Sequence, residues 1–176
     1  MRTACVMGCV LALALAFAVS IQCTRESRGD DDDAGDDTSG AVGNPTQSAC
    51  QSGTKDDGYT KEEVVNAHFS GGTLSVEHVF TCRNCGFAFS GTYLIAGNVI
   101  AVTEEDVSTV PAGCDCFFTV DYEIPGVQAG AVYTLRIYEF DEWEGASADP
   151  RLILEETLDL SAQTDFVFSL GENTCI

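Results

Sequence analysis

Alternation of apolar and polar side chains with a period of two is the feature that most limits how this chain can fold. In the segment FTVDYEI, apolar side chains stand at Phe118, Val120, Tyr122 and Ile124, with polar side chains between them. Successive side chains of a β-strand point to opposite faces, so such a strand buries one face and leaves the other in water. Residues 133–138 alternate in the same way. Because helical periodicity is nearly absent, the pattern predicts an all-β fold.

Turns that contain glycine separate the alternating segments. Gly71-Gly72 and Gly97-Asn98 each stand between two such segments, and tight hairpin turns need the positive φ that glycine adopts readily. Further strands are expected at residues 152–160 and 166–170. This spacing predicts an immunoglobulin-like, Greek-key β-sandwich of about seven or eight strands over residues 58–176.

A long apolar segment near the N-terminus predicts that the chain is exported. Arg2 is followed by an almost unbroken apolar run over residues 4–21, which is the pattern of a secretory signal. Cleavage after Ala18 fits the small-x-small rule and would release a secreted chain. Without cleavage, this run of 18 residues is just long enough for a membrane-spanning helix, which needs about 17 to 25. Both routes place the folded part outside the cytoplasm.

Cys23 closes this run in the segment AVSIQC, which resembles the lipid-acceptor site of bacterial lipoproteins. That family normally has Gly, Ala or Ser where this chain has Gln22, and Leu or Val where it has Ser20. The resemblance implies a signal peptide of residues 1–22 and lipid attachment at Cys23. It also implies a lipid-anchored position at the bacterial cell envelope, in the outer membrane, facing the periplasm or the surface. Secretion after cleavage at Ala18 is the alternative.

The number of cysteines favours lipid attachment. Cleavage after Ala18 leaves seven cysteines, so that one would remain unpaired. If Cys23 carries lipid, six remain, and exported domains usually pair their thiols. The cysteines expected in disulfides are Cys50, Cys82, Cys85, Cys114, Cys116 and Cys175. Cys50 is expected to pair with Cys175.

Two closely spaced cysteine pairs raise the choice between disulfides, metal binding and redox chemistry. Cys82 and Cys85 have the spacing of a zinc knuckle, but Cys114 and Cys116 lie only two residues apart at the start of a strand. A thioredoxin-like site needs its cysteines at a helix N-terminus, whereas strands are expected on both sides here. Structural disulfides that join Cys82 and Cys85 to Cys114 and Cys116 are therefore predicted.

A metal site is the alternative use of these cysteines. His78 is expected on one strand face with Phe80 and Cys82, and a neutral imidazole beside thiolates would suit copper(I) or zinc. The ligands of this alternative site are His78, Cys82, Cys85, Cys114 and Cys116. A histidine among apolar neighbours is more often a core residue, and this interpretation is preferred unless His68 lies opposite His78. No metal or other cofactor is expected.

Residues 23–57 form an acidic segment that is predicted to be a disordered tether. The run includes Asp30–Asp33 and has almost no large apolar side chains, so it cannot bury enough surface to offset its ordering entropy. It lacks the ordered ligand spacing of an EF-hand loop. The whole chain has a formal net charge of −20, which disfavours binding to nucleic acid.

Residues 113–140, GCDCFFTVDYEIPGVQAGAVYTLRIYEF, resemble domains of bacterial exported lipoproteins in which a Cys-x-Cys pair opens a strand. Such domains generally lack an assigned activity. The resemblance therefore implies a fold and leaves the function open.

No catalytic motif is visible in the chain, which has no nucleophile elbow, phosphate-binding glycine loop or HExxH pair. The acidic residues 104–106 are expected on a solvated surface. The loop 141–150 carries the only tryptophan, Trp143, and loops at the end of a sandwich often bind ligands. The chain is predicted to be a non-enzymatic binding or structural module, bound to the membrane by its lipid, with a protein or carbohydrate partner at this loop. The alternative is a periplasmic copper, zinc or thiol-redox protein that uses His78 and the cysteines named with it.

Overall fold

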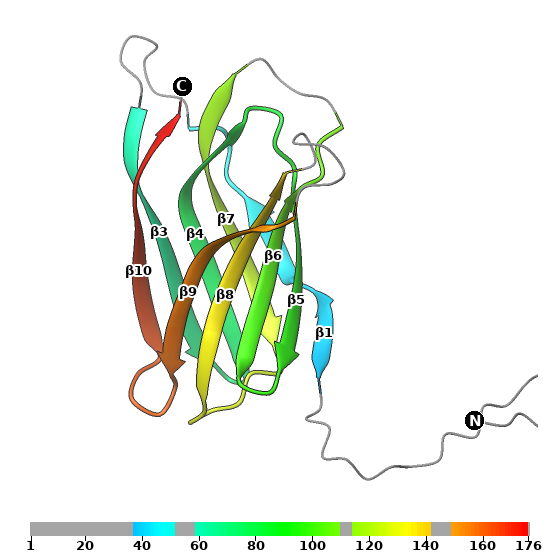
Figure 1. Cartoon of the computed structure of the whole chain (residues 1–176), viewed down its shortest axis with the longest axis vertical. Helices are drawn as coiled ribbons and strands as arrows, with labels where there is room; N and C mark the ends of the chain where they lie inside the picture. The colour runs from blue at the N-terminus through cyan, green and yellow to red at the C-terminus, as the bar shows by residue number, and fades with distance from the viewer. Residues whose placement is uncertain (1–36, 52–58, 110–113, 142–148, 176) are drawn as a thin grey trace, which may run out of the picture. The chain divides into compact units, whose positions relative to one another are not determined.

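The computed structural model describes residues 37–51, 59–109, 114–141 and 149–175 (Figure 1). The chain divides into two units, residues 1–33 and 34–176, and only the second lies within the described residues. No helix among the described residues is long and apolar enough to cross a membrane.

The described residues form ten strands in two open five-stranded sheets (Figure 1). The strands are β1 (Thr38–Ala41), β2 (Gly43–Gln47), β3 (Tyr59–Ser70), β4 (Thr73–Asn84), β5 (Phe89–Ala96), β6 (Val99–Asp106), β7 (Asp115–Pro125), β8 (Val132–Asp141), β9 (Arg151–Asp159) and β10 (Asp165–Cys175). One sheet has the order β1-β5-β6-β8-β9 and the other β10-β3-β4-β7-β2. We call them the first and the second sheet. The all-β prediction is confirmed, with ten described strands in place of seven or eight; the immunoglobulin-like topology stays a prediction.

Most neighbouring strands are antiparallel, and consecutive strands form the expected hairpins. Ser70 pairs with Thr73 across the Gly71-Gly72 turn, and Ala96 pairs with Val99 across the next turn. Strands β6 and β8 are the exception, because they pair in parallel. Strand β7 of the second sheet lies between them in sequence, so the chain crosses from one sheet to the other and back.

The two short strands at the beginning of the domain lie within residues that were expected to belong to the tether. β1 pairs with β5 at the edge of the first sheet, and β2 pairs with β7 at the edge of the second. Between them, Val42 is buried in the core. Their sequences, TSGA and GNPTQ, show no alternation of large apolar side chains, and Pro45 is tolerated because an edge strand need not donate every ladder hydrogen bond. The folded domain therefore includes residues from Thr38 on, and not only from residue 58.

The core lies between the two sheets and is built from the alternating residues. Phe118, Val120, Tyr122 and Ile124 of β7 are all buried, as the sequence pattern predicts. A bulge interrupts β4, where Phe80 has a φ of 61° and the pairing with β7 shifts by one residue. Because side chains alternate along a strand, this shift exchanges the two faces beyond the bulge.

The strand register places the N-terminal entry of the domain and the end of β8 at opposite ends of the sandwich. Thr38 of β1 pairs with Ile95, close to the turn that joins β5 to β6. Strands β6 and β8 run parallel away from this turn and end at Asp106 and Asp141, which are partners. Strand β9 begins at Arg151 beside the end of β8. We call these the entry end and the far end of the sandwich.

Candidate functional site

Two of the predicted site residues lie outside the described residues. Cys23, the expected lipid acceptor, precedes residue 37, and Trp143 falls within residues 142–148. Of Cys175, the last residue of β10, only the backbone is described, and it pairs with Tyr59. The cysteines and histidines whose side chains are described all lie within the folded domain.

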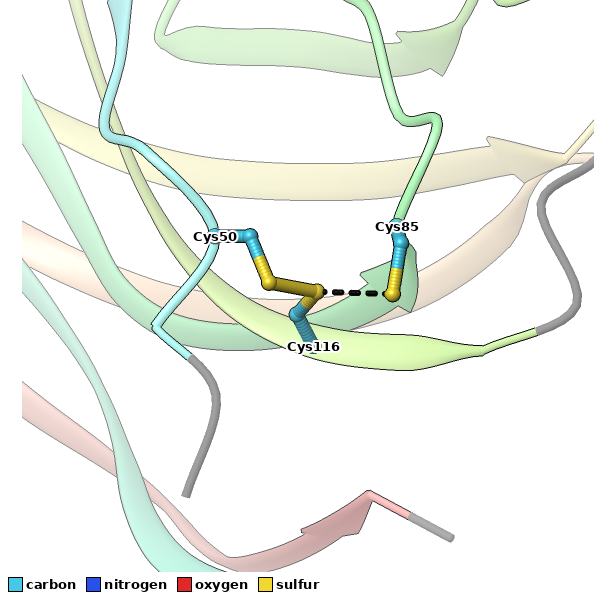
Figure 2. A group of neighbouring side chains, drawn as sticks. All are labelled: Cys50, Cys85 and Cys116. Atoms are coloured by element: carbon cyan, nitrogen blue, oxygen red, sulfur yellow. Dashed lines mark hydrogen bonds between the residues drawn. A yellow bond between two sulfur atoms is a disulfide. The ribbon is translucent and has the colours of Figure 1, made fainter. Parts of the chain in front are cut away.

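Four cysteines meet at the far end of the sandwich and form two disulfides. Cys50 is bonded to Cys116, and Cys85 is bonded to Cys114. Figure 2 shows the Cys50–Cys116 bond with the sulfur of Cys85 directed at it. The Sγ atoms of Cys116 and Cys85 are 2.9 Å apart. The Sγ atoms of Cys50, Cys85 and Cys116 all lie within 4.8 Å of one another.

The pairing of Cys50 differs from the prediction, which joined it to Cys175. Residues 48–51 run antiparallel along β7, with a hydrogen bond from the Ser48 backbone N–H to the Thr119 carbonyl and a bridge between Gln51 and Phe117. This alignment sets Cys50 beside Cys116.

The prediction bonded Cys116 to Cys82 or Cys85, and this is wrong because Cys116 is bonded to Cys50. The bond between Cys85 and Cys114 is one of those that the prediction allowed. Cys82 is also in a disulfide.

The alternative metal site of His78 and four cysteines is not assembled among the described residues. The bulge at Phe80 turns Thr81 into the interior, where Thr81 is 1% exposed, so Cys82 does not follow His78 on the same face. His68 pairs with Ser75 and does not lie opposite His78. Instead, His68 lies on the outer face of the second sheet, with its Nδ1 2.7 Å from Asp165.

His78 is fully buried between the sheets, and two carboxylates occupy both of its ring nitrogens. Its Nδ1 donates to Glu104 at 2.9 Å, and its Nε2 donates to Glu63 at 2.8 Å. The Tyr122 hydroxyl donates to the other oxygen of Glu104 at 2.8 Å, and the Asn173 amide donates to Glu63 at 2.9 Å. With no free ring nitrogen, His78 cannot also bind a metal while this network is intact.

The two carboxylates keep His78 protonated. Burial alone lowers the pKa of His78, but the negative charge of Glu104 and its hydrogen bond, followed by those of Glu63, raise it from 6.5 to about 10. Burial raises the pKa of Tyr122 well above 10, and the Glu104 carboxylate raises it further. His78 is therefore an imidazolium and Tyr122 a neutral hydrogen-bond donor at neutral pH.

A second buried carboxylate lies beside this network. Glu139 of β8 is the parallel-strand partner of Glu104 and forms ion pairs with Arg83 and Arg151. Burial raises the pKa of Glu139, but Arg83, followed by Arg151, more than offsets this and lowers it below its usual value. We call these six residues the charge network: Glu63, Glu104, Glu139, His78, Arg83 and Arg151. Three carboxylates thus face three cations.

The charge network is a structural brace. Its residues belong to β3, β4, β6, β8 and β9 and join the two sheets. Buried charges are tolerated when each is paired and hydrogen-bonded, as Glu104 and Glu139 are here. The network was missed in the sequence because residues 104–106 were expected on the surface. Glu104 and Asp106 continue the period-two pattern of Ile100 and Val102, and this continuity was the signal that they face inward.

The outer face of the second sheet carries a groove of about 460 Å³ across all five of its strands. Four carboxylates line it, those of Glu77, Asp121, Glu123 and Asp165. Each accepts a hydrogen bond from a neighbouring strand, for example Glu77 from Asn66 at 2.8 Å and Asp121 from Thr46 at 3.0 Å. These hydrogen bonds hold the carboxylates along the sheet, and the face is anionic.

No match to this chain is found among protein-family models, curated proteins or solved structures. A function must therefore be inferred from three features of the fold. These are the two neighbouring disulfides at the far end, the charge network and the acidic groove on the second sheet.

Proposed function

We propose that the chain is a non-enzymatic binding or structural module of the bacterial cell envelope, attached to the membrane by lipid at Cys23. Two disulfides in a small domain support an oxidising compartment outside the cytoplasm. The formal charge of −20 would oppose direct contact with anionic lipid headgroups, so the lipid would be the only membrane contact. A secreted form without lipid is the alternative.

One observation carries this proposal: the domain is entered at one end, and the candidate binding loop leaves from the other. Thr38 lies at the entry end, whereas β8 ends at Asp141 and β9 begins at Arg151 at the far end. The described residues that flank the loop 141–150 thus lie at the end of the domain opposite to Thr38. The disulfides brace the same end, which gives the loop a rigid base.

Trp143 in this loop is the proposed contact with a protein or carbohydrate partner. Full-length chain, immobilised on beads, would be incubated with envelope proteins and glycans in separate experiments. Trp143→Ala is expected to weaken retention of the partner by about 30-fold, which corresponds to the roughly 2 kcal/mol of a tryptophan hot spot. Leu94→Ala, which removes an exposed apolar side chain from β5, serves as the matched control.

The outcomes separate the two parts of the proposal. Equal retention by both variants and the wild type would contradict the role of Trp143. Cys23→Ser tests the anchor: it should move the chain from the membrane fraction to the soluble fraction, and unchanged sedimentation with membranes would contradict lipid attachment.

Thiol-redox chemistry is the second candidate, because one specific observation favours it. Cys85, Cys114 and Cys116 are brought together, although with Cys50 in place of Cys82 and His78. Copper or zinc binding by the set that includes His78 is less well supported, since both of its ring nitrogens are occupied.

A further inference from the structure

The two disulfides at the far end are close enough to exchange partners. Thiol–disulfide exchange occurs when a thiolate attacks a sulfur of a neighbouring disulfide. The Cys116 sulfur is already 2.9 Å from the Cys85 sulfur, and no other residue separates them (Figure 2). A thiolate at Cys116 would therefore have its target within reach without any movement of the backbone.

The four sulfurs differ in their access to solvent. Cys50 and Cys114 are exposed, Cys85 is half-buried, and Cys116 is 1% exposed. An external thiol can therefore reach the Cys50–Cys116 bond at Cys50 but not at Cys116. Exchange depends on which sulfur is accessible, so attack at Cys50 is favoured and Cys116 is the leaving group.

We propose that Cys50, Cys116, Cys85 and Cys114 form a thiol-exchange relay that accepts electrons from an external dithiol. A thiolate of the dithiol attacks Cys50, which forms a mixed disulfide and releases the Cys116 thiolate. The Cys116 thiolate attacks Cys85, which breaks the Cys85–Cys114 bond, forms Cys85–Cys116 and releases the Cys114 thiolate.

The second thiol of the dithiol then completes the reaction. This thiol attacks the other sulfur of the same dithiol, which is bonded to Cys50 in the mixed disulfide. The dithiol becomes an intramolecular disulfide, and the Cys50 thiolate is released. The chain has gained two electrons and two protons, and the dithiol has lost them. Cys50 and Cys114 end as thiols, and Cys85 and Cys116 as a disulfide.

Burial gives the relay its direction. Thiolates are stabilised by water, so a reduced chain favours free thiols at the exposed positions Cys50 and Cys114 over the buried Cys116.

The exchange also changes how residues 48–51 are held. In the starting state Cys50 ties residues 48–51 to β7. In the product only hydrogen bonds, such as Ser48 to Thr119, hold that segment. The inference is independent of the proposed binding role, because it concerns the sulfur atoms alone.

The test uses the full-length exported chain and one molar equivalent of dithiothreitol. After reaction, the sample is denatured in acid, where exchange is suppressed, and alkylated with N-ethylmaleimide. Peptide fragmentation at Asp115 distinguishes Cys114 from Cys116. The relay predicts alkylation at Cys50 and Cys114, with Cys114 labelled several-fold more than Cys116. Label at Cys50 and Cys116, at Cys85 and Cys114, or at Cys82 alone would overturn the relay.

Two variants sharpen this test. Cys50→Ser removes the need for a reductant, since Cys116 begins as a thiol, and the relay predicts the free thiol at Cys114. The matched control is the double variant Cys85→Ser/Cys114→Ser, which retains Cys50–Cys116 but has no acceptor disulfide. In this control, one equivalent of dithiothreitol should label Cys50 and Cys116. A free thiol at Cys116 in folded Cys50→Ser, with the fold checked by circular dichroism, would contradict the relay.

Discussion

The two ends of the sandwich interior are built from different chemistry. Near the entry end, the inward-facing residues are mainly apolar, and Leu74, Ile100, Ile124 and Leu135 among them are fully buried. Towards the far end, the same strand faces carry His78, Glu104, Thr81 and Glu139, and the disulfides lie beyond them. On β6 the change occurs between Val102 and Glu104, and on β8 between Ile137 and Glu139.

This difference shows that one sandwich can be held together in two ways. The entry half is stabilised by removal of apolar surface from water, which needs no exact partner. The far half depends on complete pairing of charges, because a buried ion without its partner is costly. The far half is therefore the more specific and the more fragile, and covalent bonds brace it.

The largest effect is expected from Glu104→Gln. This change leaves the His78 imidazolium with only Glu63 as its anionic partner and replaces the acceptor of Tyr122 by an amide. Loss of one partner of a buried ion pair typically costs about 3 to 5 kcal/mol, so the free energy of unfolding in urea should fall by this amount.

The control for this change is Glu123→Gln on the outer face of the second sheet. Glu123 accepts a hydrogen bond from Asn44 in solvent, and its substitution should change stability by about 0.5 kcal/mol or less. If Glu104→Gln were as mild as its control, the charge network would not support the far half.

A decrease in stability at alkaline pH is the next effect. The pKa of His78 is about 10 in the folded chain and about 6.5 when unfolded. The stability that its protonation contributes is therefore fully present below pH 6.5 and is lost as the pH rises through 10. Urea unfolding across this range should show a loss of a few kcal/mol. The lowered pKa of Glu139 acts in the opposite direction: its contribution is present above pH 4.5 and is lost as the pH falls.

Two variants test whether this pH dependence belongs to the far half. His78→Gln should abolish the alkaline decrease. Leu135→Ala in the entry half should lower stability by about 3 kcal/mol at every pH and leave the slope unchanged. A steeper alkaline loss in Leu135→Ala, or an unchanged one in His78→Gln, would mean that the decrease does not come from the charge network.

The smallest effect is expected from Arg151→Ala, at the exposed border of the network. The Arg151 side chain is 75% exposed, and Arg83 still neutralises Glu139 when it is removed. Exposed ion pairs contribute about 0.2 to 1 kcal/mol, so thermal unfolding should show only a minor loss. Arg83→Ala removes a partner whose side chain is only 14% exposed, so it should lower the free energy of unfolding several times more. Equal losses in the two variants would show that the difference in burial between the two arginines does not affect stability.

Local signals in the sequence predicted the strands and the hairpins, but not the pairing of strands that are distant in sequence. The alternation in β7 and the glycine turns at 71–72 and 97–98 were enough to place strands, because strand periodicity and turn chemistry depend on a few neighbouring residues. The edge strands β1 and β2 lack such signals and form because β5 and β7 offer open edges. The bulge at Phe80 was equally invisible, although it decides which residues of β4 face the core.

The sequence by itself determined the all-β class, the hairpins, the presence of disulfides in the folded domain and the interpretation of His78 as a core residue. Only the tertiary structure decided that Cys50 meets Cys116, that the two disulfides touch, and that Glu63 and Glu104 enclose His78. The reason is physical: alternation and turns act over a few residues, whereas these contacts join segments 15 to 66 residues apart. Such contacts form when two sheets pack, and their pairing is set by register and by the bulge in β4.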